Sequence, residues 1–290
     1  MQKKSGFTLL ELSMAVAVIG VLLSVMMVIE NLRDNAKYKA FYKEMAGLRE
    51  KVVNFKAIYG YLPGDFPKAG QVFKHILSTC TDETLHSDNA TGCNGDGNNN
   101  WNTGLTAGCC YGEGYMSWLH LQLADLIGAP SGGDNYYKGY EYQTDPSSTN
   151  NNLYESKVYG GVLYLPLENW YNNLNHPSVR GPRYRIGPFT SGYDTANAGL
   201  FTPLELRNLD VKFDDGHPKT GELEGMNFFS SSNNFGGFRS SDGSVNHDDD
   251  CTTFEDDWNY GTDKSANLIA ATYKVENPKK ACMPQFIIKD

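Results

Sequence analysis

The sequence predicts an α+β protein in which one long N-terminal helix precedes a loop-rich body with an antiparallel sheet. Three observations predict this class: an apolar run at the start of the chain, a helical stripe of apolar residues after it, and short strand-like runs between turns farther on. A long helix followed by short strands and loops is typical of α+β proteins. The 290 residues are enough for one or two domains with a core.

The first element is an apolar run over residues 7–29, whose one charged residue is Glu11. As a helix this run would be roughly 34 Å long, which is enough to cross a hydrocarbon core of roughly 30 Å. Lys3 and Lys4 precede it, and such a positive flank stays on the cytoplasmic side. The run is also longer than the apolar part of a cleaved secretory signal. We therefore expect a transmembrane segment at 7–29 with the rest of the chain outside.

The second element is an amphipathic helix over residues 30–60. Its apolar stripe recurs with steps of four and three residues, the helical period, at Phe41, Met45, Leu48, Val52, Phe55 and Tyr59. Gly60 and the Pro63–Gly64 pair supply the stop. We expect one continuous helix from about Phe7 to Tyr59, with its second half packing one face on the body.

The body, residues 61–290, contains two further predicted helices and four predicted strands. EGYMSWLHLQLADLI at 113–127 reads as a buried helix, and Thr202-Pro-Leu-Glu205 is a capping box that opens a helix ending near 214–216. Strand-like runs occupy 161–167, 183–187, 222–228 and 285–288. The segments 80–112, 130–157 and 229–263 are expected to be loop-rich insertions.

Six cysteines favour disulfides over a zinc site, because none has the spacing of zinc ligands. They are Cys80, Cys93, Cys109, Cys110, Cys251 and Cys282. A bond between the neighbours Cys109 and Cys110 would be strained, so each is expected to pair elsewhere. We expect Cys251 and Cys282 to close a C-terminal loop and the other four to tie the middle region together. Free buried thiols are the alternative.

One loop has the pattern of a cation site. Oxygen-bearing side chains alternate along CNGDGNNNW, and calcium loops converge their ligands in this way; the residues are Asn94, Asp96, Asn98 and Asn100. An EF-hand would need a glutamate where Leu105 stands. A polar turn without a metal is therefore the alternative, and we expect that the protein requires no cofactor, with calcium as the candidate cation.

Charge and motifs exclude two classes of function. A formal charge of −9 argues against nucleic acid as a partner, because phosphate binding needs clustered Lys and Arg. The sequence contains no nucleophile elbow, phosphate-binding Gly-rich loop or H-E-x-x-H zinc motif. We therefore expect that the protein is not an enzyme.

Glu11 needs a partner, because a carboxylate in hydrocarbon costs about 2.5–3.5 kcal/mol on insertion scales. A cut between Gly6 and Phe7 would create an α-amino group four residues before Glu11. That amine, or the same amine of a neighbouring subunit, would offset the buried charge and set the register between packed helices. The alternative is an interfacial glutamate without a role.

The stretch KKSGFTLLELSMAVAVIGVL resembles the prepilin signature of type IV pilins and type II secretion pseudopilins. The resemblance implies that residues 1–6 are a leader ending in Gly6. It also implies that a prepilin peptidase cuts before Phe7 and N-methylates it, and that Glu11 guides assembly. A pilin-like fold, with the long helix packed on the sheet of the body, is implied as well.

Stretches of the body resemble a group of large pilin-like proteins that carry the prepilin cleavage domain. They are YLPGD at 61–65, NGDGN at 94–98 and DDGHPKTG at 214–221. This second resemblance supports the same family but indicates little about function.

Taken together, these features predict a structural subunit, a minor pilin or pseudopilin, of a type IV pilus or type II secretion filament. The expected partners are prepilin peptidase, other pilins or pseudopilins, an inner-membrane assembly platform and, before assembly, membrane lipid. The expected location is the bacterial inner membrane, with the N-terminus cytoplasmic and the body periplasmic, and then the filament. The alternative is a filament-borne adhesin or a substrate-binding tip subunit that uses the loops of the body.

Overall fold

The computed structural model describes most of the chain in eleven stretches: residues 8–78, 80–84, 92–101, 103–104, 111–130, 135–137, 153–167, 181–188, 199–227, 251–253 and 270–288. The chain divides into two compact units, Met1–Lys43 and Glu44–Asp290. Helix α1, Leu9–Tyr59, begins in the first unit and ends in the second. The prediction of one continuous helix that stops before Gly60 is confirmed.

The predicted apolar stripe of α1 is the buried face of its second half. Phe41, Met45, Leu48, Val52 and Phe55 are at most 2 % exposed, and Tyr59 is half-buried. Fully burying each such side chain contributes about 1.5–3 kcal/mol. Within the second unit, polar contacts of Glu44 fix the same segment: its carboxylate accepts hydrogen bonds from the Ser156 hydroxyl at 2.6 Å and the Tyr164 hydroxyl at 3.0 Å.

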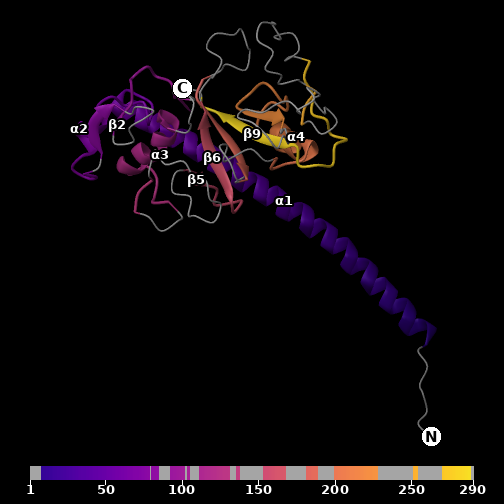
Figure 1. Ribbon diagram of the computed structural model, residues 1–290. Coiled ribbons are helices and arrows are strands. Elements are labelled where there is room, and N and C mark those ends of the chain that lie inside the picture. Colours follow the sequence, from indigo (N-terminus) through magenta and orange to yellow (C-terminus); the bar gives the residue numbers. More distant parts are fainter. Residues whose placement is uncertain are drawn as a thin grey trace, which may run out of the picture. The chain divides into compact units, whose positions relative to one another are not determined.

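The second unit is built on a five-stranded antiparallel sheet with the order β5-β6-β7-β9-β8 (Figure 1). Its strands are β5 (Tyr154–Glu155), β6 (Val162–Leu167), β7 (Arg183–Pro188), β8 (Leu223–Asn227) and β9 (Cys282–Ile287). The four predicted strands are therefore confirmed, and the short β5 lies in a segment predicted as loop. The mixed α+β class is confirmed with them.

Strand β9 begins three residues before its predicted start because Pro284 is tolerated inside it. β7 pairs with β9 only from Gln285 to Ile287. Pro284 therefore lies beyond the end of that ladder, where the missing N–H of proline costs no ladder hydrogen bond.

Aromatic side chains fill the core between the sheet and helix α3 (Glu113–Leu123). The rings of Trp118 and Tyr184 stack with centroids 4.9 Å apart, and Trp101 lies 5.4 Å from Tyr184. Tyr184 sits opposite Phe286 in the sheet register, and both are fully buried. The sheet and α3 therefore share one core, as expected for a layered α+β fold.

Helix α3 ends at Leu123, four residues before its predicted end at 127. The cause is a left-handed residue, Asp125, with φ +58°. The Leu126 N–H donates to the carbonyl of Leu121, and the Asp125 N–H donates to that of Gln122. These two bonds form a Schellman motif, which ends the helix without glycine.

Helix α4 (Pro203–Phe213) begins with the predicted capping box. Thr202 accepts the Glu205 N–H, and the Glu205 carboxylate accepts the Thr202 N–H at 2.8 Å. Proline stands in the first turn, where its missing N–H costs nothing. The sequence signal and the observed helix start therefore agree.

Short elements occupy the region around the predicted loop 80–112. They are helix α2 (Ala69–Phe73) and strands β1 (Thr81–Thr84), β2 (Gly92–Asn94), β3 (Thr103–Gly104) and β4 (Tyr111–Gly112). β1 and β2 pair in parallel, so this pair is an exception to the antiparallel pairing predicted for the fold. A disulfide between Cys80, just before β1, and Cys93, within β2, holds the two segments together.

The second disulfide joins Cys251 to Cys282, which is the pairing predicted at the C-terminus. Cys109 and Cys110 lie outside the described residues. The expectation that each of them pairs elsewhere therefore stays a prediction.

Candidate functional site

The first half of α1 presents an apolar surface. Within Leu9–Met26 the mean hydropathy is 2.3, and none of this window is buried. By length and composition it is the one helix of the described ranges that could cross a membrane. Leu10 and Val21, for example, are 70 % and 64 % exposed. An apolar surface of this size is typical of contact with lipid or with other helices.

Glu11, the predicted assembly residue, forms a capping box with Thr8 at the start of α1. The Thr8 N–H and the Thr8 hydroxyl donate to Glu11 Oε2 at 2.8 and 2.9 Å. In return, the Glu11 N–H donates to Thr8 Oγ1 at 3.3 Å. This reciprocal pair satisfies two of the N–H groups that a helix start leaves free.

Thr8 is the hydrogen-bond partner of Glu11 that sequence reasoning missed. Its signal is the pattern Thr8-Leu-Leu-Glu11, a Ser/Thr-x-x-Glu box directly before an apolar run. The same pattern was recognised at Thr202. Gly6 and Phe7, the predicted cleavage and methylation residues, lie outside the described part of the chain.

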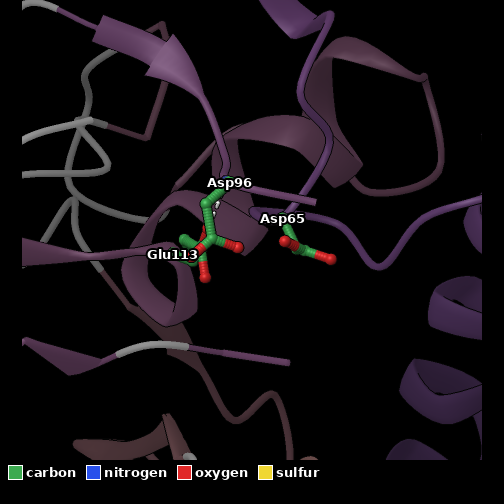
Figure 2. Close-up of side chains that lie close together, drawn as sticks. All are labelled: Asp65, Asp96 and Glu113. Carbon is green, nitrogen blue, oxygen red and sulfur yellow. Dashed lines mark hydrogen bonds between the residues drawn. The ribbon is translucent and has the colours of Figure 1, made fainter. Parts of the chain in front are cut away.

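In the second unit, three carboxylates from separate segments lie together: Asp65, Asp96 and Glu113. One oxygen of each lies within 4.8 Å of the others. Figure 2 shows the three side chains close together, with the Asp96 N–H donating to Glu113 Oε1 at 2.7 Å. Asp96 is exposed, whereas Asp65 and Glu113 are buried. We call these three residues the acidic cluster.

Asp65 is the centre of the acidic cluster because its carboxylate organises the following turn. It accepts the backbone N–H groups of Gly97 at 2.7 Å, Asn98 at 3.0 Å and Asn99 at 2.7 Å. The pKa of Asp65 is raised to about 6: burial is the main cause and the nearby Asp96 charge acts in the same direction, whereas the Asn99 and Gly97 N–H groups lower the pKa.

The donor set around this loop differs from the four predicted calcium ligands. Asn94 turns its side-chain oxygen to the Gly70 N–H at 2.8 Å. Asp96 accepts hydrogen bonds from the backbone and side chain of Asn98, both at 2.9 Å. Asp96 belongs to the acidic cluster, and Asn100 is half-buried. Asp65 and Glu113 were missed because they are distant in sequence.

His120 locks the segment that carries Asp65. Its Nδ1 accepts the Gly64 N–H at 2.8 Å, and its Nε2 lies 2.8 Å from the carbonyl oxygen of Cys93. This arrangement requires the neutral ring with its proton on Nε2. Burial lowers the pKa of His120 to about 4, against the opposing effect of the Cys93 hydrogen bond, so the ring stays neutral near pH 7.

A second carboxylate group, Asp210, Asp214 and Asp215, surrounds the turn after α4. The buried Asp210 accepts the Tyr273 hydroxyl at 2.7 Å and the Gly216 N–H at 3.0 Å. Burial raises the pKa of Asp210 to about 7, and the charges of Asp214 and Asp215 act in the same direction. In the described contacts, these carboxylates hold the backbone of the turn after α4 in place.

With this geometry established, the comparisons with known proteins bear on the first site. Residues 1–27 match the prokaryotic N-terminal methylation motif. Neither the curated proteins nor the solved structures contain a match.

The matched motif is the prepilin signature of type IV pilins and pseudopilins. It indicates a type IV pilin-like or pseudopilin precursor. It implies processing by a prepilin peptidase and assembly with other pilins. The Thr8–Glu11 capping box and the exposed apolar helix both begin inside the matched residues.

Proposed function

We propose that this chain is a structural subunit, a minor pilin or pseudopilin, of a type IV pilus or type II secretion filament. The observation that carries the proposal is that the methylation motif at 1–27 contains the exposed apolar window Leu9–Met26. A subunit that assembles through its N-terminal helix needs both a processing signal and an apolar helix surface that other subunits can cover. The pilin-like arrangement of a long helix and an antiparallel sheet is part of the same proposal.

In this proposal the precursor is a single-pass inner-membrane protein. Lys3 and Lys4 hold the N-terminus in the cytoplasm, and the body from Glu44 onward lies in the periplasm. Prepilin peptidase cuts the Gly6–Phe7 bond and methylates the new amino group of Phe7. The assembly platform then moves the helix from lipid into a bundle of like helices, where apolar side chains of neighbours replace lipid contacts.

Glu11 changes partners along this route. Before cleavage, the N–H and hydroxyl of Thr8 supply the donors that a carboxylate in lipid needs. After cleavage, the Phe7 amine of a neighbouring subunit supplies a positive charge. Thr8 belongs to the same chain as Glu11, whereas the Phe7 amine belongs to a neighbouring subunit. Only the contact with Phe7 therefore sets the axial register between subunits in the bundle.

The body has a structural role in this proposal, without catalysis and without a required metal. The carboxylates of Asp65 and Asp214 accept backbone N–H groups and so hold loops in place. Such committed carboxylates are poorly suited to act as bases or nucleophiles. The loops of the body are then available to form the filament surface.

The variant Glu11→Gln tests the proposal, because glutamine keeps the oxygen that completes the capping box and removes only the charge. We expect this variant to insert and be processed but to enter filaments poorly, measured by immunoblotting of sheared filaments against the membrane fraction. Glu50→Gln, at an exposed position on the same helix, is the matched control and should assemble normally. Incorporation of Glu11→Gln at the wild-type level would contradict the proposal.

A further inference from the structure

Along the outer edge of β8, every second N–H group points away from β9: those of Leu223, Gly225 and Asn227. Among the described residues, β8 is the last strand in the sheet order, and Gly225 lies opposite Pro284 in β9. Because Pro284 has no N–H and antiparallel pairs alternate, Leu223 and Gly225 direct their N–H groups outward. Outward N–H groups on an edge strand are a template for pairing with another chain.

The loop from Asp214 to Gly221 occupies the first two of these groups, those of Leu223 and Gly225. Asp214 Oδ2 accepts the Leu223 N–H at 2.7 Å and the adjoining Glu222 N–H at 2.6 Å. The Pro218 carbonyl accepts the Gly225 N–H at 2.8 Å. The side chain of an aspartate and the backbone of a proline therefore stand where a neighbouring strand would otherwise pair.

The local sequence fixes this loop against the edge. Gly221 has φ +78°, and a Cβ there would lie 2.1 Å from Asp214 Oδ2, so a side chain would displace the carboxylate. On the other side, the Gly216 N–H donates to Asp210 of α4. Arg49 of α1 pairs with Glu222 at 2.6 Å directly beside the covered N–H groups. The motif DDGHPKTG thus has a physical role that its sequence alone did not reveal.

We propose that the Asp214–Gly221 loop is an edge guard that prevents β8 from pairing with a strand of a second copy of this chain. Subunit bodies held side by side meet at high effective concentration. An open edge would then favour strand addition between bodies. With this edge covered, the subunit bodies associate through other surfaces, and no strand of a second copy adds to the sheet.

Two variants open the guard in different ways. Asp214→Ala removes the carboxylate, and Gly221→Ala displaces it while keeping its charge. Asp214→Asn retains an oxygen acceptor. Asp215→Ala removes a neighbouring carboxylate that accepts the His217 N–H and the Thr220 hydroxyl but neither of the covered N–H groups of β8. The last two are the matched controls.

The test measures self-association of the full chain in detergent micelles by mass photometry over a range of concentrations, after thermal melting has verified folding. We expect Asp214→Ala and Gly221→Ala to associate about tenfold more tightly than wild type, because one or two backbone hydrogen bonds become available to a partner. Asp214→Asn and Asp215→Ala should match wild type. Folded Asp214→Ala with the wild-type mass distribution would overturn the proposal.

A second measurement on the wild-type protein does not depend on the variants' folding. Hydrogen exchange resolved at single amides should show slow exchange at Leu223 and Gly225, because the guard holds both N–H groups. Exchange of these two amides as fast as that of exposed loop amides would overturn the proposal independently.

Discussion

The Asp65 carboxylate accepts the Gly97 N–H at 2.7 Å, although the two residues are 32 positions apart in the sequence. This contact joins the YLPGD and NGDGN stretches into one structural unit. Trp101 adds to the same unit, because its indole N–H donates to the Pro63 carbonyl at 2.7 Å. The turn that resembled a calcium loop is therefore organised by a protein carboxylate.

Replacement of Asp65 tests this organisation. We expect Asp65→Ala to lower the free energy of unfolding by about 2–3 kcal/mol, because three backbone N–H groups lose their hydrogen bonds to a buried, charged acceptor. Asp96→Ala, at an exposed position where the carboxylate accepts the backbone and side-chain N–H groups of Asn98, should cost less than about 1 kcal/mol. Urea unfolding of both variants compares them, and equal losses would contradict the account.

Gly64 and Gly161 form a matched pair for a test of close packing. Both have positive φ, +91° and +72°, but a Cβ at Gly64 would lie 1.9 Å from the Glu113 carbonyl oxygen, whereas Gly161 has open space around it. Gly161→Ala should therefore cost about 1 kcal/mol from backbone strain alone. Gly64→Ala should cost several-fold more or abolish folding, as read from melting temperature and soluble yield. A small effect at both positions would refute the close approach.

Asp210 gives stability a specific dependence on pH. Its pKa is about 7 in the folded protein and about 3.9 when unfolded. The folded state therefore binds more protons between about pH 4 and pH 7, so this group's contribution to stability falls as pH rises through that window. Asp210→Asn should remove this fall, roughly 1 kcal/mol per pH unit at most. If the free energy of unfolding changed with pH in the same way in the variant and in wild type, the assignment of this pH dependence to Asp210 would be disproved.

Calcium is expected to be dispensable for the fold. The carboxylates of the acidic cluster already accept hydrogen bonds from the backbone or from Asn98. Treatment with EGTA should leave the melting temperature unchanged. A drop that added Ca²⁺ reverses in wild type, but not in Asp96→Asn, would instead assign a cation to the cluster.

Much of the fold followed from local sequence patterns. Helix α1, the capping box at Thr202 and strands such as β6 and β7 each have their signal within a few neighbouring residues, through periodicity or capping chemistry. The end of α3 was missed because a non-glycine residue, Asp125, adopts the left-handed conformation. This left-handed conformation depends on the two Schellman hydrogen bonds, and the local amino-acid composition does not predict it.

The sites were predicted less completely, because their partners are remote in sequence. Glu11 was found from its isolation in an apolar run, but its local partner Thr8 was overlooked. The alternation of Asn and Asp around Asp96 suggested converging ligands, whereas the structure turns Asn94 toward α2 and brings in Asp65 and Glu113 from elsewhere. Nothing in local periodicity identifies a carboxylate more than thirty positions away.

Mass spectrometry of the N-terminus, on protein recovered from cells with and without prepilin peptidase, tests the central claim most directly. With the peptidase, we expect the mature chain to begin at N-methylated Phe7 and to lack residues 1–6. Without it, the chain should keep its leader. A chain that retains Met1–Gly6 in the presence of the peptidase, or that is cut at another bond, would contradict the account.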